Sequence, residues 1–80
     1  MKAWLRRGEL AKALGITTPT VKYYTALALF PVQKWTDHGQ FLYDVEDIRR
    51  RYERIRELKA KRLTIQEIQE RLQIEGLIRD

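Results

Sequence analysis

Few side chains in this 80-residue chain are suited to covalent or metal chemistry. There is one histidine, His38, and there is no cysteine. A chain without thiols has no disulfide and no thiolate zinc site, and one imidazole is too few for a histidine metal site. The carboxylates are spread along the chain at positions typical of helix caps and ion pairs, with no convergent base. We therefore expect no enzymatic activity, no metal site and no cofactor.

The remaining candidates for function are the positively charged side chains, which can bind an anionic partner. The sequence has 16 Lys and Arg against 11 Asp and Glu, which gives a formal net charge of +5. Residues 1–43 contain six of the bases and only two of the acids, so most of the excess charge lies in the N-terminal half. Nucleic acid is a partner of matching charge; the alternative is an ordinary basic surface without a dedicated polyanion.

The length limits the chain to one small domain, which we place at residues 1–80. No uncharged run approaches the roughly 20 apolar residues of a membrane span. The N-terminus, MKAWLRRGEL, is charged and lacks the apolar stretch of a secretory signal. We expect a cytoplasmic protein with no membrane partner.

Two short helices joined by a tight turn are predicted near the N-terminus. Residues 8–14 favour a helix that Gly15 ends, and residues 18–27 favour a second helix. Thr17 can cap the second helix, and Pro19 lies in its first turn, where the missing N–H costs little. Such a pair of helices predicts a helix-turn-helix.

The periodicity of the second helix separates an inner face from an outer face. The inner positions are Val21, Tyr24 and Thr25. The outer positions are Pro19, Lys22, Tyr23 and Ala26. A partner that approaches this helix therefore meets a proline ring, an ammonium group and a phenol.

Residues 32–43 predict a two-stranded hairpin, because β-prone runs flank the Gly-containing loop 36–39. A hairpin directly after a helix-turn-helix is a wing. Because an isolated hairpin is marginal in water, one of its faces must lie on the helices. We expect Leu42 to point inward with Tyr43 or Trp35 beside it, and the loop to stay solvated.

Two further helices are predicted, over residues 45–60 and 65–73. Asp44 is a suitable N-cap for the first of them. Thr64 and Glu67 have the spacing of a capping box for the second.

The run Arg49-Arg50-Arg51 is similar to a nucleic-acid patch, but Asp47 and Arg51 are also correctly spaced for an ion pair on one helix. We favour a solvated outer face for most of these arginines.

Together these elements predict a mainly α-helical winged helix-turn-helix with a small β-hairpin. Its motifs follow one another as GELAK from Gly8, GIT from Gly15, VKYY from Val21, LFP from Leu29, the segment Gly39–Tyr43, Asp47-Ile48, and TIQEI from Thr64. In this order and spacing they resemble the N-terminal DNA-binding domain of MerR-family transcriptional regulators. The resemblance covers about residues 5–72.

The resemblance implies sequence-specific binding of double-stranded DNA, with the second helix in the major groove and the wing on flanking phosphates. The contacts of that helix are implied at Thr18, Pro19, Lys22 and Tyr23, while Tyr24 belongs to the core. On the wing the available contacts are Lys34, Trp35, His38 and Gln40. The indole of Trp35 is either such a contact or part of the core.

The chain departs from the family pattern at several positions. Lys22 stands where an arginine usually grips a phosphate, so the charge remains but the planar fork is lost. Phe41 stands where the wing usually has an arginine, and Arg7 stands where an aliphatic residue is usual. Ala28 and Arg62 occupy two helix ends at which glycine is usual. If φ is positive at these positions, each non-glycine residue lowers the stability of the fold by about 1 kcal/mol.

The alternative function is a winged-helix module that binds a protein through Trp35 and Phe41 and has lost DNA binding. Full-length proteins that resemble this domain continue into a long dimerisation helix. We therefore expect either the DNA-binding fragment of a longer regulator, which forms a homodimer on DNA at the nucleoid, or a stand-alone module.

Overall fold

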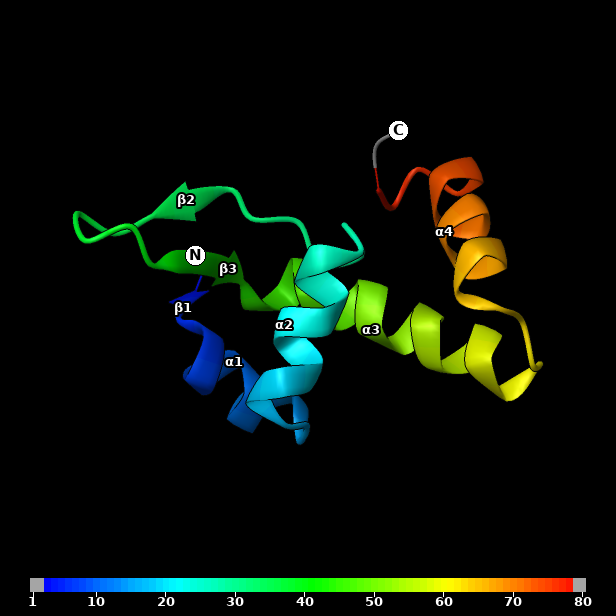
Figure 1. Ribbon diagram of the computed structural model, residues 1–80, viewed down its shortest axis with the longest axis horizontal. Coiled ribbons are helices and arrows are strands. Elements are labelled where there is room, and N and C mark those ends of the chain that lie inside the picture. Colours follow the sequence, from blue (N-terminus) through cyan, green and yellow to red (C-terminus); the bar gives the residue numbers. More distant parts are fainter. Residues whose placement is uncertain (1–2, 79–80) are drawn as a thin grey trace.

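A computed structural model describes residues 3–78 of the chain (Figure 1). It is mainly helical with a small antiparallel sheet, and this confirms the predicted fold class. The elements follow the order β1 (Trp4–Leu5), α1 (Arg7–Leu14), α2 (Thr18–Ala26), β2 (Lys34–Trp35), β3 (Phe41–Asp44), α3 (Val45–Ala60) and α4 (Ile65–Ile74). Each helix begins and ends within one residue of the range expected from the sequence.

Helices α1 and α2 are held by local chemistry at the turn between them. Gly15 adopts a left-handed conformation with φ of 71°, and its N–H donates to the carbonyl of Lys12. The hydroxyl of Thr17 accepts the N–H of Thr20 at 3.3 Å and so caps α2. These two residues set the angle at which α2 leaves α1.

The sheet contains a strand that the sequence analysis did not predict. Its order is β1-β3-β2, with β3 in the centre and antiparallel to both neighbours. Strand β1 is only two residues long, and it pairs Leu5 with Tyr43 across a long stretch of sequence. A two-residue strand has no periodicity to detect, so only its partner reveals it.

The side chain that anchors β3 in the core is Tyr43, and the expectation for Leu42 was wrong. Tyr43 is fully buried, whereas Leu42 is half-buried and Trp35 is exposed. Successive residues of a strand point to opposite faces, so Leu42 and Tyr43 cannot both face the helices. The Tyr43 hydroxyl lies 2.7 Å from the hydroxyl of Thr25, which ties the wing to α2.

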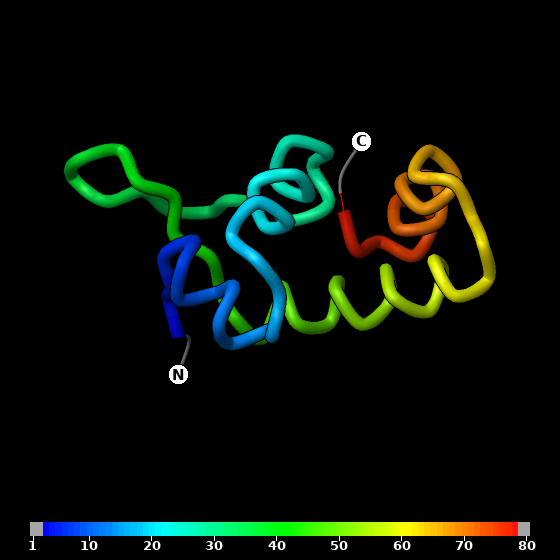
Figure 2. The backbone as a smooth tube through the Cα atoms, turned by 60° about the horizontal axis from the view of Figure 1, so that its bottom comes forward, coloured from blue at the N-terminus to red at the C-terminus, as the bar shows by residue number. Residues whose placement is uncertain are grey.

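Helix α3 runs along the length of the molecule, and Figure 2 shows the wing near one end of this helix and α4 near the other. The molecule measures 37 × 25 × 24 Å along its principal axes. Apolar side chains from both halves meet along α3. Its buried positions are Ile48, Ile55 and Leu58, and they join Leu10, Val21, Leu29, Phe30, Ile68 and Leu72 in one core.

The two predicted N-caps behave differently. Thr64 and Glu67 form the capping box, since the Thr64 N–H donates to Glu67 at 2.9 Å and the Glu67 N–H donates to the Thr64 hydroxyl at 3.2 Å. Asp44 occupies the N-cap position of α3 but makes no capping hydrogen bond with its side chain. Because Asp44 is also the last residue of β3 and is paired with Trp4, the sheet dictates its backbone.

Candidate nucleic-acid interface

The outer face of α2 presents the four side chains that the sequence analysis assigned to DNA contact. Thr18, Pro19, Lys22 and Tyr23 are all exposed, and Tyr23 exposes 52% of its surface. Tyr24, the next residue, is buried, and its ring meets Phe30 edge-on with centroids 5.2 Å apart. The adjacent tyrosines therefore divide as the helical phase requires, one toward solvent and one into the core.

The wing presents the other four residues of the predicted site. Lys34, Trp35, His38 and Gln40 are exposed. The Lys34 ammonium lies 4.6 Å from the centre of the Trp4 ring, which restricts where this charge can point. Trp35 exposes 59% of its surface, which excludes its role as a core residue.

The tip of the wing is organised by Thr36. Its N–H donates to the carbonyl of Gln40 at 2.8 Å, and its hydroxyl accepts the Gln40 N–H at 3.1 Å. Gly39 closes the turn with φ of 79°. The loop that carries His38 is thus a defined turn.

A hollow of about 570 Å³ lies between α1, α2 and the wing. We call it the α1 hollow; its lining residues are Arg6, Arg7, Gly8, Glu9, Thr18, Gln40 and Phe41. It brings Thr18 of α2 and Gln40 of the wing to the same place, and it adds Arg6 and Arg7, which the predicted site omitted. The departure from an aliphatic residue at position 7 was the sequence feature that pointed to Arg7, and no such feature pointed to Arg6.

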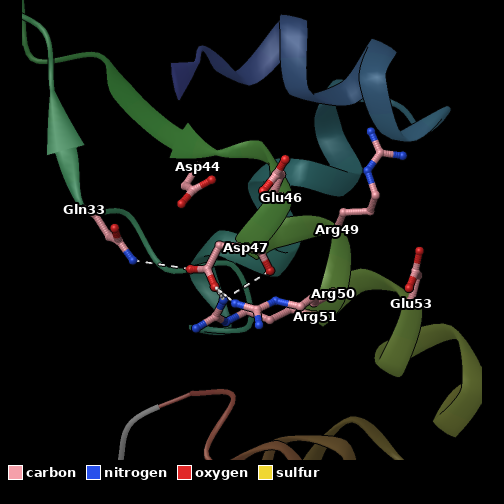
Figure 3. Close-up of a pocket in the computed structure, with 8 residues that line it drawn as sticks. All are labelled: Gln33, Asp44, Glu46, Asp47, Arg49, Arg50, Arg51 and Glu53. Atoms are coloured by element: carbon pink, nitrogen blue, oxygen red, sulfur yellow. Dashed lines mark hydrogen bonds and ion pairs between the residues drawn. The ribbon is translucent and has the colours of Figure 1, made fainter. Parts of the chain in front are cut away.

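A second hollow, of about 700 Å³, lies at the start of α3, and two of the three arginines that line it are paired with Asp47 (Figure 3). Asp47 binds both Arg50, at 3.1 Å, and Arg51. Burial alone would raise the pKa of Asp47, but the hydrogen bonds and charges of Arg51 and Arg50 outweigh it and hold the pKa below its ordinary value. Arg49 and Arg50 are exposed and Arg51 is paired with Asp47, which agrees with the expectation that most of these arginines lie on a solvated outer face.

A metal-binding cluster and a membrane-spanning helix are both absent from the part of the chain that the structure describes. Residues 3–78 contain no group of three or more His, Asp or Glu side chains that could hold a metal ion. Within the same range, no helix combines the length and apolar character that crossing a bilayer requires.

The fold and the exposed residues of α2 and the wing define a winged helix-turn-helix domain. The sequence pattern described as MerR HTH family regulatory protein matches residues 5–74. The chain therefore belongs to the MerR family of transcriptional regulators, whose members are not enzymes.

Individual relatives agree with this assignment. The chain is 30% identical to the HTH-type transcriptional regulator YfmP of Bacillus subtilis over 66 residues, which is 82% of this chain and 47% of that protein. It is 40% identical to the nodulation protein NolA of a Bradyrhizobium species over 63 residues, 79% of this chain and 26% of that protein. The chain thus spans less than half the length of these curated relatives.

A solved structure shares the fold. The crystal structure of a MerR-family transcriptional regulator from Bacillus cereus superimposes with a TM-score of 0.74 at 24% sequence identity. The match covers 98% of this chain and 55% of that one.

Proposed function

We propose that the chain binds specific sequences in double-stranded DNA, with α2 in the major groove and the wing on the flanking phosphates. The observation that carries this proposal is that all eight residues assigned to DNA contact are exposed, and that they lie on α2 and the wing. A helix with exposed polar and basic side chains suits the major groove of a duplex, and a basic wing beside it suits the phosphate backbone.

The exposed side chains have two roles in the proposed complex, phosphate binding and base contact. Lys22, Tyr23 and Lys34 bind phosphates and position the domain, because phosphate contacts set register without reading sequence. Thr18 and Pro19 touch base edges at the start of α2, where their methyl and ring carbons suit the thymine methyl group. Apolar contacts of this kind give modest specificity to one copy of the domain.

Discrimination between sites then requires two half-sites. A homodimer on a palindromic site doubles the bases that are read, and in a longer chain a dimerisation helix supplies the link. The location that follows from this function is the cytoplasm, at the nucleoid.

The salt dependence of DNA binding tests the role of Lys22. Fluorescence anisotropy titrations of a labelled random duplex, at salt concentrations from about 50 to about 200 mM, give the slope of log K against log salt. Lys22→Ala should weaken binding to all sequences and make this negative slope shallower by about 0.9, because one phosphate contact is lost. Arg71→Ala, which removes one exposed charge from α4, is the matched control.

An unchanged slope for Lys22→Ala would show that Lys22 does not bind a phosphate. The complete absence of wild-type binding at tens of micromolar and low salt would overturn the DNA proposal.

A second candidate function is protein binding through the wing. It is favoured by Trp35, whose exposed indole meets Phe41 edge-on with centroids 6.3 Å apart. Failure to bind any duplex, together with a folded domain, is the outcome that would favour this alternative.

A further inference from the structure

We propose that Arg7 binds a phosphate of the DNA backbone from within the α1 hollow. This inference rests on the proposed DNA binding and adds a contact residue that lies outside α2 and the wing. Three observations carry it: the position of the hollow, its charge, and the state of the Arg7 guanidinium.

The first observation is the position of the hollow. One wall is Thr18, the first residue of α2, and another is formed by Gln40 and Phe41, where β3 leaves the tip of the wing. A nucleic-acid backbone that touches both α2 and the wing therefore passes over this opening. The first turn of α1, which begins at Arg7, forms the remaining wall.

The second observation is the charge of the lining. Arg6 and Arg7 face a single acid, Glu9. The Glu9 carboxylate already accepts the backbone N–H of Arg6 at 2.9 Å, as the second half of the cap of α1. The hollow thus offers two guanidinium groups beside one carboxylate that is already hydrogen-bonded, and this balance favours an anion.

The third observation is the state of the Arg7 side chain. Its Nε is buried and has no hydrogen-bond partner within residues 3–78. Arg51 also has a buried Nε without a partner, but its Nη1 is paired with Asp47. No such acid lies within ion-pair distance of Arg7 in the described range. A guanidinium that has no partner within residues 3–78 and lines a cationic hollow suits the two-point binding of a phosphate through its Nη atoms, since its Nε is buried.

The walls of the α1 hollow formed by Thr18, Gln40 and Phe41 have no charged side chain. Phe41 occupies the wing position at which the family resemblance implies an arginine. Arg6 and Arg7 are therefore the guanidinium groups that the α1 hollow offers within residues 3–78.

A matched pair of charge deletions tests the proposal. Arg7→Gln and Arg71→Gln each remove one positive charge, but Arg71 lies on α4, which packs on α3 away from the wing. In anisotropy titrations of one random duplex across salt concentrations, Arg7→Gln should make the negative slope of log K against log salt shallower by about 0.9. Arg71→Gln should leave the slope at the wild-type value. Circular dichroism and thermal melts verify that both variants fold.

A rescue variant separates a phosphate contact from a general loss of structure. Adding Phe41→Arg to Arg7→Gln returns a guanidinium to the same hollow, so the slope should recover. Arg7→Lys should keep the slope and lower the affinity, because the charge remains while the fork is lost.

Two outcomes would overturn the inference, and they are distinguishable. Equal slopes for wild type and Arg7→Gln, with the wild type bound to DNA, would mean that the Arg7 stem covers apolar surface and its head is solvated. That result would leave the proposed DNA binding intact. Absence of wild-type binding would overturn both proposals together.

Discussion

Two residues are held in a backbone conformation that their side chains disfavour. All four helices end with the same pair of hydrogen bonds, one spanning five residues and one spanning three, as at Leu29 to Tyr24 and Ala28 to Thr25. The residue at the centre of each motif has positive φ. It is glycine after α1 and α4, but Ala28 with φ of 61° after α2 and Arg62 with φ of 65° after α3. The Cβ atoms of these two residues make the turns strained.

Replacing either residue with glycine should therefore stabilise the protein. Ala28→Gly and Arg62→Gly should each raise the free energy of unfolding by roughly 1 kcal/mol, since relief of the left-handed strain exceeds the entropic cost of glycine. Urea denaturation measures the change. Ala13→Gly, in the last turn of α1 where the backbone is still helical, is the control and should destabilise by about 0.5–1 kcal/mol. Destabilisation at position 28 or 62 would contradict the strain argument.

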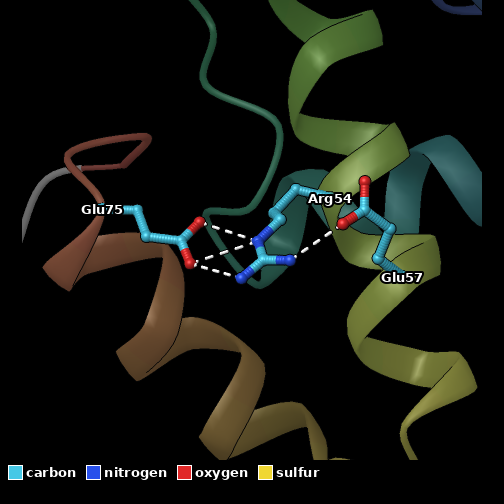
Figure 4. A network of polar contacts seen from close by, with 3 residues as sticks. All are labelled: Arg54, Glu57 and Glu75. Carbon is cyan, nitrogen blue, oxygen red and sulfur yellow. Dashed lines mark hydrogen bonds and ion pairs between the residues drawn. The ribbon is translucent and has the colours of Figure 1, made fainter.

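At the scale of elements, the end of α4 is clamped to the middle of α3. The Arg54 guanidinium donates three hydrogen bonds to the Glu75 carboxylate, from Nη2 at 2.6 Å and from Nε at 2.8 and 3.1 Å (Figure 4). Its Nη1 donates to Glu57 at 2.9 Å. These bonds raise the pKa of Arg54 and lower the pKa of Glu75 below its ordinary value of 4.5. The clamp adds a polar link to the apolar packing of Ile68 and Leu72.

The clamp should make stability fall in acid. The pKa of Glu75 is lower in the folded state than in the unfolded state. The stability that its carboxylate contributes is therefore fully present above about pH 4.5 and is lost as the pH falls through the pKa of the folded state. Glu75→Gln should therefore lower the melting temperature near neutral pH and reduce the loss of stability on acidification. Glu70→Gln, on the exposed surface of the same helix, is the control. Thermal melts from pH 7 to pH 3 make the comparison; an equally steep decline in Glu75→Gln would contradict it.

The anchoring of the wing is also decided at this scale. The pattern Phe-Leu-Tyr at positions 41–43 is apolar throughout, so alternation alone does not say which side chain faces the core. Pairing with β1 and the hydroxyl contact between Tyr43 and Thr25 settle it in favour of Tyr43. The helix-turn-helix was predictable because Gly15, Thr17 and Pro19 act on their own neighbours.

At the scale of the whole molecule, the exposed large apolar side chains are dispersed. Within residues 3–78 they are Tyr23 on α2, Trp35 on the wing and Ile74 at the end of α4. A stable dimer interface needs a contiguous area of several hundred Å² on each partner. The three side chains lie on separate elements and do not provide one.

The 80-residue chain should accordingly be a monomer in the absence of DNA. Sedimentation equilibrium at tens of micromolar should give the monomer mass of 9.6 kDa. A palindromic duplex should bind two copies, each on its own half-site. A doubled mass without DNA would contradict the prediction, and Ile74→Gln would then show whether the end of α4 forms the interface.

The sequence by itself determined the helices, the turn between α1 and α2, the outward face of α2 and the excess of positive charge in the N-terminal half. Each of these depends on residues within a few positions of one another, whose propensities, caps and periodicity act locally. Only the tertiary structure decided the third strand, the burial of Tyr43 and the α1 hollow. Residues 4 to 9, 18 and 40 to 44 meet in space after the whole core has formed, and no local pattern encodes that meeting.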